Sequence, residues 1–108
     1  MSRKNPYKAL RDVHIQAYIQ ASEGKGVERH SMGESFEDQP ICVLTRQLGL
    51  GFPLGQAMKK IIESQKLAKF PGRSKAELLG AINYLAAAII VLEEQVVALS
   101  KVKQGEGK

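Results

Sequence analysis

Glycine and lysine residues that could hold a phosphate are concentrated in the stretch GLGFPLGQAMKK, residues 49–60. A helix N-terminus presents free backbone N–H groups and the positive end of the helix dipole, and both attract anions. Glycines allow a ligand to approach the backbone closely, and lysines add charge-assisted contacts. The predicted anion site consists of Gly51, Gly55, Lys59 and Lys60, with Arg46 from the preceding helix and Arg29 and His30 from a preceding loop.

The same stretch has a simpler interpretation, a turn between two helices. It lacks the Gly-Lys-Ser/Thr of a P-loop and follows no recognisable parallel strand. In this interpretation Gly49 ends one helix in the left-handed conformation, Pro53 begins the next helix, and Gly55 allows tight packing. Both interpretations are open from the sequence.

A second group of polar residues lies in the segment ERHSMGESFED, which contains His30, Glu34, Glu37 and Asp38. A structural zinc site takes four protein ligands and a catalytic one three, so one histidine among loop carboxylates predicts no metal and no cofactor. We expect a loop whose last acid, Asp38, caps the following helix. Cys42 is expected to be a small buried hydrophobe. No serine or cysteine nucleophile pairs locally with a histidine, so no catalytic residue is predicted.

Glu63, Glu77 and Asn83 are polar residues in the helical half of the chain. The two acids are similar to part of the metal site of the all-α nucleoside triphosphate pyrophosphohydrolases of the MazG type, which hold magnesium with paired acids on helices. That resemblance implies metal-dependent hydrolysis, although two of the acids that the family uses are missing here. Asn83 could instead fix helix register in an apolar core.

The strongest helical pattern covers residues 74–103. Ser74 and Glu77 match a capping box at its start. A heptad seam of apolar residues follows, with alternating spacings of four and three: Leu78, Ile82, Leu85, Ile89, Leu92, Val96 and Leu99. The other faces are also apolar as far as Glu93, so we expect this helix to be buried on all sides in a bundle. Its uninterrupted apolar run, 84–92, is shorter than the roughly 20 residues of a membrane span.

The remaining elements are predicted around this helix. A helix over about 53–70, ended by Pro71 and Gly72, would form an antiparallel hairpin with it. A shorter helix is predicted over 39–48. Residues 6–22 are ambiguous, because Asn5 and Pro6 are typical of a helix start whereas the residues from Val13 to Ala21 alternate as in a strand. Helix is favoured there, followed by a long loop rich in glycine and charge.

Length and charge limit the classes of protein. A chain of 108 residues is expected to be one helical domain, 1–103, with a flexible basic tail, 104–108. It is too short to cover an all-apolar helix by itself, which predicts a homo-oligomer. The net charge of +5 comes from the two ends, since residues 31–100 carry seven basic and seven acidic residues. Basic ends without a basic face argue against nucleic-acid binding. One cysteine and no signal-like start favour the cytoplasm.

The hairpin PLGQAMKKIIESQKL to ELLGAINYLAAAIIVLEE resembles, in outline, the phage proteins that sequester cyclic-nucleotide second messengers. That resemblance implies a small helical oligomer that binds nucleotides between its subunits, and it transfers no individual residue. Three functions are therefore considered: a non-catalytic binder of a small phosphate-bearing ligand, a protein-interaction or regulatory module, and a metal-dependent nucleotide hydrolase.

Overall fold

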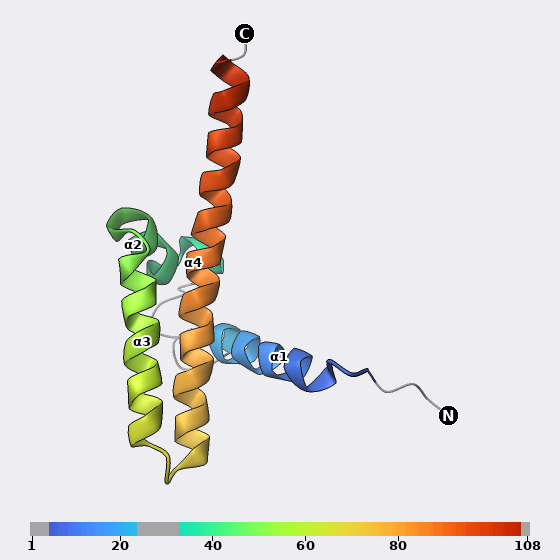
Figure 1. Cartoon of the computed structure of the whole chain (residues 1–108), viewed down its shortest axis with the longest axis vertical. Helices are drawn as coiled ribbons and strands as arrows, with labels where there is room; N and C mark the ends of the chain where they lie inside the picture. The colour runs from blue at the N-terminus through green and yellow to red at the C-terminus, as the bar shows by residue number, and fades with distance from the viewer. Residues whose placement is uncertain (1–4, 24–32, 107–108) are drawn as a thin grey trace.

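The computed structural model describes residues 5–23 and 33–106, and the regular structure within these ranges is entirely helical. The elements are α1 (Lys8–Glu23), the short 3-10 helix η2 (Phe36–Asp38), α2 (Pro40–Leu48), α3 (Gly51–Lys66) and α4 (Pro71–Glu106). The all-α prediction is confirmed, and the strand alternative for residues 6–22 is wrong. Figure 1 shows α3 and α4 side by side as an antiparallel hairpin, with α2 beside them and α1 lying crosswise to α4.

The turn of the hairpin differs from the prediction because Pro71 begins a helix instead of ending one. A proline at the first helical position loses no hydrogen bond, since that N–H has no partner inside the helix. Ser74 is therefore already inside α4, and its N–H donates to the carbonyl of Phe70 at 2.9 Å. Its hydroxyl donates to the carbonyl of Ser64 in α3 at 2.9 Å, which ties the two helices together. The predicted capping box with Glu77 is wrong.

Two other predicted helix ends are corrected in part. Asp38 does not cap α2, because it belongs to η2, and the N-cap residue of α2 is Gln39, whose side chain makes no capping hydrogen bond to the helix. Gly49 ends α2 with a positive φ of 88°, which favours glycine, although its ψ of 179° is extended and not left-handed helical. At the other end of the chain, Asn5 Oδ1 accepts a hydrogen bond from the N–H of Tyr7 just before α1 begins.

The buried core consists mainly of small side chains. Buried apolar residues are Ala17, Cys42, Ala57, Leu79, Ala81, Ala87, Ala88 and Val91, and Thr45, Pro53 and Ser64 are buried with them. Cys42 is buried as predicted. Small side chains on α4 let the backbones of neighbouring helices approach closely, so one face of α4 is sealed by α3 and α2 with few large residues.

The C-terminal third of α4 projects beyond the other helices (Figure 1). Every side chain from Leu92 to Val102 is exposed. The helix continues to Glu106, so residues 104–106 are helical and not part of a tail, while residues 107–108 lie outside the described part of the chain.

Candidate functional site

The heptad seam of α4 faces outward. Its exposed members are Leu78 at 44%, Leu85 at 41%, Ile89 at 58%, Leu92 at 40%, Val96 at 65% and Leu99 at 68%. The expectation that α4 is buried on all sides is therefore wrong for the single chain. The helix packs against α3 through its alanine-rich face, because those short side chains permit the closest approach. The larger seam residues lie away from that contact, where α1 borders Ile82, Leu85 and Ile89 but leaves Leu85 and Ile89 exposed.

An apolar groove adjoins the seam. Its volume is about 910 Å³, and it lies between α1, the segment that begins at Gly33, and α4. Its floor is formed by α4 residues, of which Ile82, Leu85 and Ile89 belong to the seam. Ala17 and Tyr18 from α1 and Phe36 from η2 form the walls. Groove and seam thus form one continuous apolar surface, which we call the α4 seam surface.

Two side-chain amides fix α1 against α4 and so define one wall of this groove. Asn83 Nδ2 donates to the carbonyl of Ala17 at 3.0 Å, and Gln20 Nε2 donates to the carbonyl of Ala76 at 3.3 Å. Ala17 is the buried residue of α1. The polar role of Asn83 in the bundle was predicted, but its partner is the α1 backbone. Nothing in the sequence identified that partner, which is 66 positions away.

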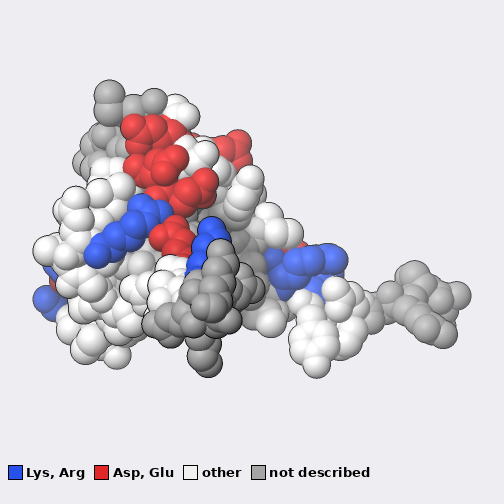
Figure 2. All heavy atoms as spheres, turned by 90° about the horizontal axis from the view of Figure 1, so that it is seen from above, with Lys and Arg blue, Asp and Glu red and all other residues white. Residues whose placement is uncertain are grey.

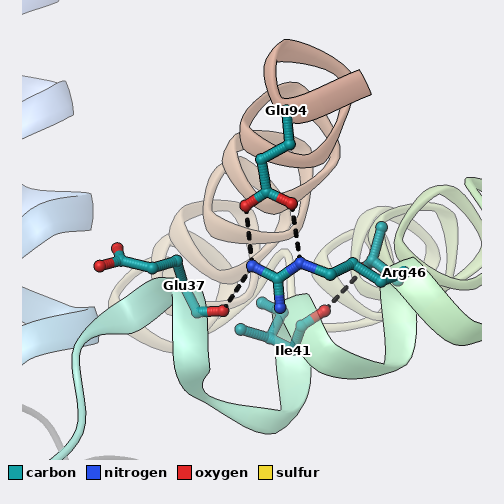
Figure 3. Close-up of polar contacts among 5 residues, drawn as sticks. Glu37, Ile41, Arg46 and Glu94 are labelled. Carbon is teal, nitrogen blue, oxygen red and sulfur yellow. Dashed lines mark hydrogen bonds and ion pairs between the residues drawn. The ribbon is translucent and has the colours of Figure 1, made fainter. Parts of the chain in front are cut away.

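Arg46 holds the other wall in place (Figure 3). Its Nε donates to Glu94 Oε1 and its Nη2 to Glu94 Oε2, both at 2.8 Å, and Nη2 also donates to the carbonyl of Glu37 at 2.7 Å. This forked pair lowers the pKa of the Glu94 carboxyl, mainly through the hydrogen bonds from the guanidinium. One side chain thereby connects α2, η2 and α4, and its charge is already matched by a carboxylate.

The residues of the predicted anion site do not all lie together. Gly51, Gly55 and Lys59 follow one another at intervals of four along α3 and are exposed, and a Cβ added at either glycine would meet nothing within 4 Å. Within the described part of the chain, nothing packs tightly against Gly55. Lys60 turns toward α4, where its Nζ lies 3.6 Å from Glu77 Oε2 and 5.9 Å from the Tyr84 ring centroid.

The other three basic members of the predicted site are Arg46, Arg29 and His30. Arg46 is engaged with Glu94 as described above, and Arg29 and His30 lie outside the described residues. Among the described members of the predicted set, the structure therefore brings together no cluster of free cations. The anion site stays a prediction, and the described residues that it now concerns are Lys59 and the glycines at the start of α3.

The acids considered for a metal site are also separated into ion pairs. Glu63 Oε1 lies 3.5 Å from Lys66 Nζ, and Glu77 pairs with Lys60. Within residues 5–23 and 33–106, no three His, Cys, Asp or Glu side chains form a group that could hold a metal ion.

Acidic side chains gather near the projecting end of α4. Glu37, Glu93 and Glu94 line a shallow hollow together with Ile90 and Val97. Figure 2, which looks from above, shows acidic side chains concentrated in one area of this face. A surface that binds nucleic acid through phosphates needs the opposite charge.

One helix, Pro71–Val102, is long and apolar enough to span a membrane by length and composition, with a third (33%) of its most apolar window buried inside the chain. The core helix of a soluble protein passes the same test. Here α3 lies beside α4 and carries Lys59, Lys60, Glu63 and Lys66, and such charges are costly in a bilayer interior. The absence of a membrane partner stays a prediction.

The comparisons with known proteins add no family. The sequence matches no protein-family model, and no curated protein or solved structure was found to be similar to it.

Proposed function

We propose that this chain is a non-catalytic protein-interaction module that binds a partner helix along the α4 seam surface. The observation that carries the proposal is the exposure of the heptad seam, whose six most exposed members are 40 to 68% accessible. An amphipathic helix docks into such a surface by placing its own apolar side chains between those of the first helix. Burial of the apolar surface supplies the main driving force.

The size of the surface supports this role. The six seam residues expose on the order of 600 Å² per chain, at the upper limit of the largest apolar patch of a typical monomer. The groove beside α1 and the exposed Val102, which flanks the seam, extend the surface further. An apolar area of this size, in one continuous strip along a helix, is typical of a protein interface.

The alternatives have less support from the described contacts. Arg46 and Lys60 make ion pairs within the chain, which lowers the charge available to a phosphate. Binding of a small phosphate-bearing ligand by the remaining residues is a separate hypothesis, and its test is given below. Hydrolysis of a nucleotide would need further acids close to Glu63 and Glu77.

The experiment compares Val96→Glu/Leu99→Glu with the wild type and with Lys101→Glu. Both seam positions lie on the projecting end of α4, where they contribute to no core, so the helical fold should survive and circular dichroism checks this. We expect the double variant to lose the association measured by light scattering after size exclusion, or the partner recovered from extracts of the host. Lys101→Glu, which lies off the seam, should behave as the wild type. Identical association and recovery for all three proteins would contradict the proposal.

A further inference from the structure

We infer that the occupant of the α4 seam surface is a second copy of this chain, with the two α4 helices parallel and in register. The inference rests on the proposed function and specifies its partner. It follows from three observations: the residue types along the exposed seam, the projecting end of α4, and the exposed apolar area of the seam.

The residue types along the seam alternate regularly. The positions that begin each heptad are β-branched: Ile82, Ile89 and Val96. The intervening seam positions are all leucine: Leu78, Leu85, Leu92 and Leu99. β-Branched residues at the first core position and leucine at the second favour a parallel, two-stranded coiled coil, because each type fits the packing geometry of its own layer. In a parallel pair each residue meets its own copy, so the layers match only in register.

The residues beside the seam allow the same arrangement. The flanking positions are Leu79, Ala81, Ala86, Ala88, Glu93, Gln95, Ser100 and Val102. In the parallel register Glu93 lies opposite Ala88 of the partner, so no like charges meet across the interface. Leu79, Ala81 and Ala88 are buried within the chain, so over the lower part of the seam the partner would meet the seam residues themselves.

The projecting end of α4 gives a second argument. Side chains from Leu92 to Val102 are all exposed, and a single helix end of this length is marginal in water without tertiary contacts. In the parallel arrangement the two projecting ends pair with each other. In an antiparallel arrangement each projecting end would run beside the first turns of the partner's seam, and the two projecting ends would not meet each other.

The area is also sufficient. A standard interface buries about 800 Å² per partner. The seam residues supply on the order of 600 Å² of this, and Val102, which flanks the seam, is 56% exposed. A second copy of the chain can therefore cover the surface without any further element.

The test uses single-cysteine variants in a Cys42→Ala background: Leu78→Cys, Leu99→Cys and the control Lys101→Cys, which lies on the far side of α4 from the seam. Each is oxidised mildly and analysed by non-reducing electrophoresis, alone and in a mixture with one component tagged. We expect both seam variants to form covalent dimers with themselves, and the control to form none. Light scattering of the reduced wild type should give twice the 11.9 kDa of the chain.

Other outcomes overturn the inference in distinguishable ways. Cross-linking only between Leu78→Cys and Leu99→Cys in the mixture would indicate an antiparallel pair and leave the interaction function intact. The chain could instead be monomeric at all concentrations and bind a different protein, and Val96→Glu/Leu99→Glu could abolish that binding. This result would support the proposed interaction function and contradict the inference that the partner is a second copy. A monomer that floats with phosphatidylcholine vesicles would assign the seam to lipid and contradict both.

Discussion

Arg46 and Glu94 form a two-pronged ion pair that attaches α2 to α4 where α4 leaves the helical bundle (Figure 3). The two hydrogen bonds are both 2.8 Å long. The geometry depends on the planar fork of the guanidinium, which lysine cannot reproduce. We expect Arg46→Lys to lower the hydrogen-exchange protection of α2 while leaving α3 unchanged. Equal protection of α2 in both proteins would show that the pair is incidental.

The same pair predicts a pH dependence with a definite sign. The pKa of Glu94 is lowered from its ordinary value of 4.5, so the folded state binds the proton more weakly than the unfolded state does. Its contribution to stability is present above that ordinary value and is lost as the pH falls through the folded pKa. The melting temperatures of wild type and Glu94→Gln should therefore differ at pH 7 and converge as the pH falls below 4.5 and through the folded pKa. A difference that is constant over this range would contradict the assignment.

Ala87 is fully buried on α4, and a larger side chain there would separate the helices. We expect Ala87→Leu to reduce the free energy of unfolding by about 1–3 kcal/mol, the usual cost of overpacking a close-packed core. Ala98→Leu is the matched control, because it makes the same change on the exposed end of the same helix. Urea titration of both variants measures the difference in stability. Similar midpoints for Ala87→Leu and Ala98→Leu would show that the core accommodates a larger side chain at position 87.

Asn83 supplies one of the two amide bonds that hold α1. Asn83→Ala removes its hydrogen bond to Ala17, which is worth about 1 kcal/mol. Hydrogen exchange of α1 should accelerate while that of α3 stays constant. Gln95→Ala, a change of similar kind on the exposed part of α4, should affect neither helix. Unchanged exchange of α1 in Asn83→Ala would mean that apolar contacts alone hold this helix.

Cys42 should be unreactive in the folded protein. The side chain is 0% exposed, and burial raises the pKa of its thiol above the ordinary value of 9.0. At pH 8 the group is therefore a shielded thiol and not a nucleophilic thiolate. Reaction with a disulfide reagent should be slow in buffer and fast in urea. Rapid labelling in buffer would indicate that α2 opens readily.

The phosphate hypothesis is tested by calorimetric titration with linear and cyclic nucleotides against wild type, Lys59→Ala and Lys60→Ala. If the start of α3 binds phosphate, Lys59→Ala should weaken the affinity, and added salt should weaken it further. Lys60→Ala should have the smaller effect, since that side chain is paired with Glu77. Equal affinity in all three proteins, or no binding at millimolar ligand, would return the stretch to its interpretation as a turn.

The spacing of apolar residues predicted where the helices lie better than it predicted which side of each helix is buried. The hairpin and its two long helices followed from the spacing of apolar residues, because that spacing is set by the helix itself. The same spacing did not predict which side of α4 is buried. This helix has an alanine-rich side and a leucine-rich side, and the side that is buried depends on which one lets a neighbouring helix pack most closely. In α1 the alternation of Val13, Ile15 and Ile19 resembled a strand because these side chains are exposed, and no buried face constrained their order.

Residues that mark helix ends were misinterpreted where the same residue type has two structural roles. A proline after a helix ends that helix or starts the next one, and Pro71 does the second. Serine caps a helix or bonds to another one, and Ser74 bonds to Ser64. The groove could not be predicted at all, because its walls come from segments about 60 positions apart whose contact depends on Asn83 and Gln20.

The attachment of α1 has a consequence for the order of folding. Its two amide bonds join residues 56 and 66 positions apart, whereas α3 and α4 are neighbours in the chain. Contacts between neighbours form first, because a short loop closes at a smaller cost in entropy than a long one. During synthesis α1 therefore leaves the ribosome first and docks last, after the first part of α4 has emerged. In the interval Ala17, the buried residue of α1, is without the cover that α4 provides, so α1 gains its tertiary contacts only after most of the described chain has been made.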